Sequence, residues 1–349
     1  MSDHIDNVKR AVEFKKPTYL PMETEQVPHI YNAYHTLNPD EVQFIPGTEN
    51  FDSFWPQAYS WFFEEIGKNE QKETIYSDQF GTKLKIPNNM NSTYVLLEHP
   101  LEKNPNFKEY EFPDPKKIEK KYIELKKVIG RYYSDRFVNG FIDPGFFLTT
   151  NFILGIQNFF MKVATDLNLV VDIYEKVIDY YKQITVYFKN ADAHMITVIE
   201  DWGQNSGMVI NPIVWRKEFK PRLKKFYNYV HDLGLYTSIC MDGNTEAVHK
   251  DLLDMDIDLF FIPDIKTTGI KKVKENLAGK ICLKAPVDMK DTLAVGTPGE
   301  VKKEADELVR ELSTPDGGFI CEIVKWHRPA YSDENVMASV EAFNRYRKK

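Results

Sequence analysis

Short apolar runs alternate with amphipathic stretches along this chain from about residue 137 onward. Such alternation is typical of a parallel β-sheet covered by helices. Six strands are predicted, at Phe137–Ile142, Met195–Glu200, Leu235–Cys240, Ile257–Ile262, Ile281–Ala285 and Gly318–Glu322. Six β–α units in about 210 residues, with room upstream for two more strands, favour a (β/α)8 TIM barrel over an open doubly wound sheet. No GxGxxG motif follows the first strand, which argues against a dinucleotide-binding fold.

Two helices carry clear start signals. Asn211-Pro212 offers a cap followed by proline in the first turn, ahead of a helix that runs to about Asp232. Thr297-Pro298-Gly299-Glu300 forms a capping box before Val301–Leu312, where apolar residues recur at helical spacing.

The first 115 residues differ in character, being rich in Pro, Asn and aromatic residues. A hairpin is predicted over Glu73–Ile86, turning at Gln79-Phe80-Gly81. We therefore expect one structural domain, in which residues 1–115 form an N-terminal extension packed on the barrel and residues 116–349 form its main part.

Composition narrows the class of protein. The 349 residues are 42% hydrophobic and carry 45 Lys and Arg against 52 Asp and Glu, a net charge of −7. The hydrophobic content excludes a disordered chain, and the net negative charge disfavours nucleic-acid binding. The stretch Pro144–Met161 has no charge but is too polar for a membrane span, so we expect no membrane partner. Three cysteines without a CxxC pair, and a start that lacks the regions of a secretory signal, predict a cytoplasmic protein.

Acidic residues and a thiol follow the predicted strands, where the reacting groups of a TIM barrel lie. They are Asp143, Glu200-Asp201, Cys240-Met241-Asp242, Asp264, Asp288 and Glu322, with Trp326-His327-Arg328 just beyond. Any one of these acids alone is more simply explained as a helix cap or an Asx-turn. Six of six strands ending in an acid or a thiol is harder to explain in that way.

The sequence leaves two chemistries open at this rim. It has no Ser-His-Asp order, no phosphate-binding glycine loop and no HExxH motif. What remains is a divalent metal held by oxygen, nitrogen and sulfur, or acid catalysis by carboxylic acids whose pKa is raised by crowding. His327 suits either role, but it could equally bond a backbone carbonyl. Aromatic residues near the rim are mostly expected in the core, although those of Pro144–Met161 could wall a pocket for a flat substrate.

Several segments together resemble the uroporphyrinogen decarboxylase superfamily over roughly residues 120 to 347. They are Ala193-His194-Met195 through Glu200-Asp201, Asn211-Pro212 with Trp215, Met241-Asp242-Gly243-Asn244, Pro286-Val287-Asp288 with Gly296-Thr297-Pro298, and Gly317-Gly318-Phe319-Ile320 leading to Glu334-Asn335. Members of that superfamily are (β/α)8 barrels, and they include a cofactor-free decarboxylase and cobamide-dependent methyltransferases. Dimers are common among them, so a homodimer is one expectation.

Departures from the family pattern separate its branches. The decarboxylase signature Arg-x-x-Gly-Arg has no counterpart near residues 28–34, which argues against porphyrin decarboxylation. The thiol-methylating branch carries a zinc site of His-x-Cys-Gly-Asn plus a later Cys. Cys240, Asp242 and Lys325 stand at the matching positions here, which argues against a zinc that activates a thiolate acceptor in the family manner.

Four further segments look more like the O-demethylase methyltransferases of acetogens and related anaerobes. They are Leu235-Tyr236-Thr237-Ser238, Asp242-Gly243-Asn244, Val287-Asp288-Met289 and Trp326-His327-Arg328-Pro329. This resemblance implies transfer of a methyl group from a small methoxylated aromatic compound to the cob(I)amide of a partner corrinoid protein. The alternatives are a methyltransferase with another donor or a thiol acceptor, a decarboxylase, and a catalytically inactive binding barrel.

Site residues are predicted on this basis. Glu200, Asp242, Glu322 and His327 would activate the ether oxygen, either as acids or as ligands of a zinc ion together with Cys240, and Asp288 would orient them. The aromatic ring would be held by Phe147, Trp202, Tyr236 and Trp326.

Overall fold

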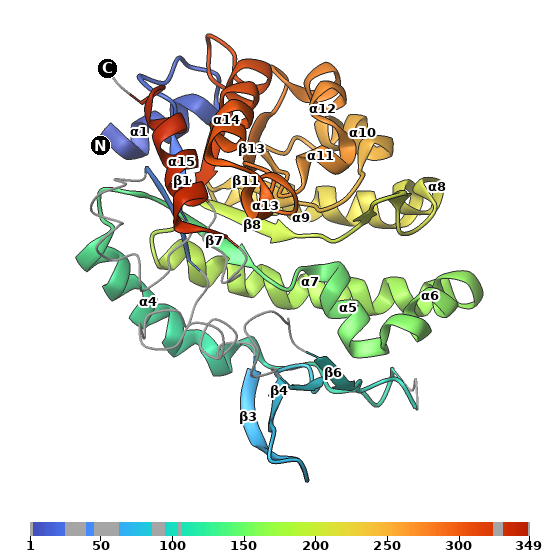
Figure 1. Cartoon of the computed structure of the whole chain (residues 1–349). Coiled ribbons are helices and arrows are strands. Elements are labelled where there is room, and N and C mark those ends of the chain that lie inside the picture. The colour runs from blue at the N-terminus through green and yellow to red at the C-terminus, as the bar shows by residue number, and fades with distance from the viewer. Residues whose placement is uncertain are drawn as a thin grey trace.

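The computed structural model describes residues 3–24, 40–44, 63–85, 95–103, 107–323 and 331–347. Its centre is a closed barrel in the spatial order β1-β14-β13-β12-β11-β8-β7-β2. The strands are β1 (Met22–Thr24), β2 (Glu41–Phe44), β7 (Phe137–Ile142), β8 (Met195–Ile199), β11 (Tyr236–Cys240), β12 (Leu259–Phe261), β13 (Cys282–Pro286) and β14 (Phe319–Ile323). Each neighbouring pair is parallel. The fold is therefore TIM-barrel-like, as the alternation along the chain predicted (Figure 1).

The six predicted strands are present within two residues of their expected bounds. The largest difference is at β12, predicted over Ile257–Ile262. There the Asp258 side chain, rather than a backbone carbonyl, accepts the N–H of Thr237 at 2.7 Å, so the ladder begins only at Leu259.

Helices surround the barrel (Figure 1). They are α4 (Glu119–Tyr132) after the turn η2 (Pro115–Ile118), α5 (Phe146–Leu154), α6 (Ile156–Thr165), α7 (Leu167–Asn190), α8 (Pro212–Val214), η3 (Trp215–Phe219), α9 (Lys220–Asp232), η4 (Glu246–Val248), α10 (His249–Asp254), α11 (Ile265–Thr268), α12 (Ile270–Leu277), α13 (Thr292–Val295), α14 (Pro298–Leu312) and α15 (Asp333–Asn344). The helix predicted from Asn211 to Asp232 is α8, the π-helical turn η3 and α9 in succession. The capping box of α14 is confirmed at Thr297 and Glu300.

The N-terminal segment does more than cover the barrel, because β1 and β2 lie within residues 1–115 and belong to the barrel itself. The predicted hairpin is β4 (Thr74–Asp78) with β5 (Lys83–Lys85). It belongs to an antiparallel sheet with β3 (Phe63–Lys68) and β6 (Val95–Glu98), which projects away from the barrel in Figure 1. Phe80 of the hairpin turn anchors this sheet on α7, with its ring 5.0 Å from that of Tyr180.

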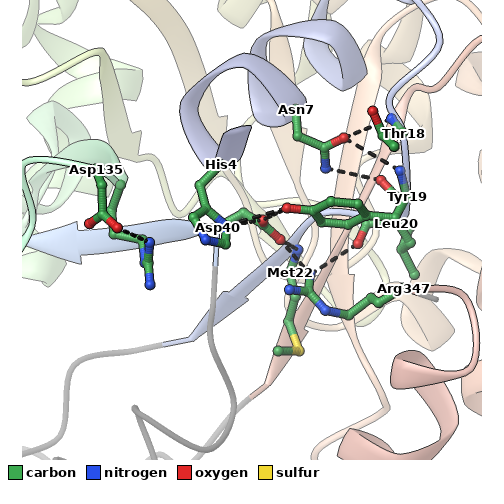
Figure 2. Close-up of polar contacts among 10 residues, drawn as sticks. His4, Asn7, Thr18, Tyr19, Leu20, Met22, Asp40, Asp135 and Arg347 are labelled. Atoms are coloured by element: carbon green, nitrogen blue, oxygen red, sulfur yellow. Dashed lines mark hydrogen bonds and ion pairs between the residues drawn. The ribbon is translucent and has the colours of Figure 1, made fainter. Parts of the chain in front are cut away.

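Helix α1 (Asp3–Val12) closes the amino end of the barrel. Its buried apolar residues join the cluster that fills the barrel interior. Beside it, Asp40 accepts hydrogen bonds from His4 Nδ1 and Tyr19 Oη, both at 2.7 Å, and pairs with Arg347 (Figure 2). These contacts tie α1, the start of β2 and the end of the described chain together.

The barrel strands contribute side chains to two apolar clusters. Alternate residues such as Phe137 and Phe141 of β7 lie in the cluster inside the barrel, whereas Val138 and Ile142 lie in the larger cluster under the helices. This period of two decides which way a side chain points at the end of each strand.

Cys240, Cys282 and Cys321 are all free and buried. Among the helices that the structure describes, none is both long and apolar enough to cross a membrane.

Candidate active site

The carboxyl ends of the barrel strands form the region that we call the mouth. Four acids lie there, each two positions after an inward-facing residue of its strand, so that it also faces inward. They are Asp143 after Phe141, Asp201 after Ile199, Asp242 after Cys240 and Glu322 after Ile320. We call these four residues the mouth acids. The sequence alone contains the signal that selects them, because an inward residue is followed two positions later by another inward residue.

Several charged groups at the mouth act on the Cys240 thiol. Burial raises the pKa of this thiol, and the charges of Asp242, Glu322 and Asp143 raise its pKa further, while Lys284 lowers it. These four charged groups come from the ends of three strands and from the interior of a fourth. Three of the mouth acids, Asp143, Asp242 and Glu322, therefore lie close enough to one another to act on the same thiol.

Asp143 and Asp201 both have raised pKa values. Burial raises the pKa of Asp143 to about 6, and the neighbouring charge of Asp201 raises it as well. Burial also raises the pKa of Asp201. A carboxyl group with such a pKa keeps a proton available near neutral pH, which is what a general acid requires. Both residues were expected at the rim, but neither was among the predicted catalytic residues.

Beneath the mouth, the barrel interior holds an ion pair that the sequence did not reveal. Lys284 of β13 pairs with Glu23 of β1, and both side chains are fully buried. The Lys284 ammonium lies 4.8 Å from the ring centre of Phe261 and 5.7 Å from that of Phe141. A lysine in the middle of the predicted apolar strand Ile281–Ala285 was the available signal.

Glu200 lies on the other face of its strand. Its Oε1 accepts hydrogen bonds from the backbone N–H of Phe146 at 2.8 Å and of Phe147 at 3.3 Å. Burial raises the pKa of Glu200 to about 8. Because Gly145, the N-cap residue of α5, has no side chain to offer, the Glu200 carboxyl group caps that helix. The structure thus places Glu200 under α5 rather than in the mouth.

Asp288 also binds backbone. Its Oδ1 accepts from the N–H of Asp291 at 2.7 Å and of Thr292 at 3.1 Å, at the start of α13. Lys266 approaches the same oxygen at 3.8 Å. Two of the predicted catalytic carboxylates, Glu200 and Asp288, therefore have the helix-capping contacts that were the simpler explanation for strand-end acids.

Phe147 and Trp202 lie together, with ring centres 4.2 Å apart. Trp202 is fully buried and Phe147 is 4% exposed, and both belong to the cluster between the barrel and the helices. They form the packed wall behind the mouth rather than an open slot.

Tyr236 is at the opposite end of the barrel, which corrects its assignment as a substrate contact. It is the first residue of β11, and its hydroxyl donates to Glu13, just after α1, at 2.5 Å. Strand starts and strand ends lie at opposite ends of a parallel barrel, so this ring does not reach the mouth. Trp326 and His327, the other two predicted contacts beyond β14, lie outside the described residues, as does Lys325.

The expected zinc site has no support among the described donors. No group of three or more His, Cys, Asp or Glu side chains within the described ranges is placed to hold a metal ion. The three described candidates, Cys240, Asp242 and Glu322, do not make such a group. We therefore derive no step of the reaction through a metal.

Comparison with known proteins places the chain in a family. The family model of uroporphyrinogen decarboxylase (URO-D) matches residues 74–346. A methyltransferase from Methanosarcina mazei superposes with a TM-score of 0.74 over 98% of both chains, at 15% sequence identity. A glycosylated endo-β-1,4-xylanase from Gloeophyllum trabeum gives a TM-score of 0.46 at 8% identity, covering 93% of this chain and 96% of that one. No curated protein sequence matches the chain.

The first superposition shows a shared fold, and the second is too weak to support any argument. The family match spans most of the barrel, from β4 to the turn after α15, and it covers more than half of the sequence. The protein belongs to the uroporphyrinogen decarboxylase family.

Proposed function

We propose that this protein is a methyltransferase that moves a methyl group from a methoxylated aromatic compound to the cob(I)amide of a partner corrinoid protein. Membership of the uroporphyrinogen decarboxylase family and the fold shared with a methyltransferase support the general class. The raised pKa of Asp143 among the mouth acids is the observation that favours ether cleavage. A cytoplasmic location and a homodimer are part of this proposal.

The chemical obstacle is the leaving group. A methyl ether resists displacement because the phenolate leaves poorly, and a proton on the ether oxygen removes this obstacle. The cob(I)amide of the partner protein would supply the electron pair that forms the new bond to the methyl carbon. The C–O bond breaks with its electrons on oxygen, and a mouth acid delivers the proton there, so that a phenol is released.

We assign this proton transfer to Asp143, with Asp201 beside it. Burial, together with the neighbouring charge of Asp201, raises the pKa of Asp143 to about 6, so this carboxyl group keeps a proton near that pH. Asp242, Glu322 and His327 remain proposed contacts of the substrate oxygen. Glu200 and Asp288 act indirectly in this proposal, because they hold the first turns of α5 and α13 at the mouth.

The charges at the mouth disfavour the decarboxylase alternative. A tetrapyrrole with many carboxylates would need free cations, but Lys266 and Lys290 beside the mouth and Lys284 beneath it already pair with acids. Lys266 lies 2.7 Å from Glu304, Lys290 pairs with Asp264 and Lys284 pairs with Glu23. A neutral or weakly polar substrate suits this charge distribution better.

The test is methyl transfer to free cob(I)alamin, reduced chemically, from separate panels of methoxyarenes, methylated amines and methanol. Transfer from a methoxyarene with release of the corresponding phenol is the expected result. Transfer from an amine or methanol alone, or onward to a thiol, would replace this proposal with the other methyltransferase function. No turnover with any donor would leave a decarboxylase or an inactive barrel.

A further inference from the structure

The Glu23–Lys284 ion pair is unusual for its position. The interior of a TIM barrel is normally packed with branched apolar side chains. Here a lysine and a glutamate, both fully buried, form an ion pair inside the barrel with two phenylalanine rings around the ammonium.

Strand register brings Glu322 beside this pair. Glu23 of β1 and Glu322 of β14 are direct register partners, so their backbones lie about 4.8 Å apart. On its other side Glu322 pairs with Pro286, two residues beyond Lys284 on β13. The Lys284 side chain spans from β13 to Glu23 on β1 and passes β14, because β14 lies between those two strands. This path takes the Lys284 side chain past Glu322, which is 1% exposed.

The stability of the folded protein does not by itself explain why this ion pair is present in the barrel. Desolvation of two charges offsets much of their attraction, and apolar replacements of a buried pair are often neutral or stabilising. A departure from the packing rule without a clear gain in stability is expected at functional sites.

We propose that Lys284, held by Glu23, is a positioning residue that fixes the direction of the Glu322 carboxylate at the barrel mouth. The importance of this arrangement for methyl transfer rests on the proposed function, whereas the arrangement itself does not. Glu322 is then the mouth acid whose orientation depends on charges from two other strands.

The first experiment separates stability from activity with Lys284→Met, Glu23→Gln and the double variant. Each single variant leaves one charge buried without its partner, so its Tm is expected to fall by about 5–10 °C. The double variant removes both charges of the pair and is expected to regain part of the lost Tm, although Glu322 then lacks the neighbouring Lys284 charge. Its kcat for methyl transfer is nevertheless expected to stay at least about 10-fold below wild type, with KM changed less than about 3-fold.

A purely structural ion pair would give another pattern. Activity would then return together with Tm in the double variant, and that result would overturn the proposal. The matched control is the pair Lys220–Asp251, 2.8 Å apart between α9 and α10 and outside the barrel. Lys220→Met with Asp251→Asn is expected to leave both kinetic constants unchanged.

The second experiment does not depend on methyl transfer. Lys284→Met and Glu322→Gln are combined in a double-mutant cycle of the change in Tm. If Lys284 holds Glu322, the double variant will lose clearly less than the sum of the two single losses. Additive losses would overturn the proposal. This second test remains available if the Glu23→Gln/Lys284→Met double variant fails to fold. Absence of turnover with every donor, together with a non-additive cycle, would reject the proposed function and retain this inference.

Discussion

The Glu200 carboxyl group accepts a hydrogen bond of 2.8 Å from the backbone N–H of Phe146, across 54 positions of sequence. The end of β8 thereby caps α5, the helix that follows the neighbouring strand β7. This contact fixes the wall of the mouth without bringing Glu200 into it.

Replacing Glu200 should test this structural role. Glu200→Ala leaves two buried N–H groups of α5 without an acceptor and is expected to lower the free energy of unfolding by about 3 kcal/mol. Glu200→Gln keeps an amide oxygen at the same place and should cost about 1 kcal/mol. Urea denaturation measures both. If Glu200 instead supplies the catalytic proton, Glu200→Gln would abolish transfer while Glu200→Ala and Glu200→Gln would differ little in stability.

Glu200 should also make stability depend on pH. Burial raises the pKa of Glu200 to about 8 in the folded protein, against 4.5 for the free side chain. Between these values the folded state binds more protons than the unfolded state, so stability falls as pH rises from about 5 to about 8. We expect wild type to lose at least about 1 kcal/mol more than Glu200→Gln over this range. Parallel curves for the two proteins would contradict the contribution of Glu200.

Asp143 should control the pH dependence of methyl transfer. The protonated form is the active one, so kcat/KM for a methoxyarene is expected to fall as pH rises through about 6, the raised pKa of Asp143. Asp143→Asn cannot donate this proton and should lose about 10²–10⁴ in rate, with the limb near pH 6 removed. A wild-type profile that stays flat from pH 5 to 8 would exclude Asp143 as the acid.

Tyr236 offers a control at the far end of the barrel. Because its hydroxyl contacts Glu13 near α1, Tyr236→Phe should cost about 1 kcal/mol of stability and leave KM for the aromatic donor unchanged. Steady-state kinetics and urea denaturation on the same preparation check both parts. A KM raised several-fold would restore Tyr236 as a substrate contact.

Local pattern in the sequence was sufficient for much of the fold. Six barrel strands were predicted because buried parallel strands appear as short apolar runs, and α14 because its capping box lies within four residues. The period of two along each strand also distinguishes inward Asp201 from outward Glu200, although they are adjacent in sequence.

Long-range contacts decided the rest. The short strands β1 and β2 pair with β14 and β7, far away in sequence, so no local pattern marks them as barrel strands. The partner of Lys284 is Glu23, and the partner of Tyr236 is Glu13, in each case more than 200 positions away. The sequence by itself determined which residues are acidic and where strands end. Only the tertiary structure decided which acids bind backbone, which pair with a cation and which face the mouth, because burial and neighbouring charge belong to the packed molecule.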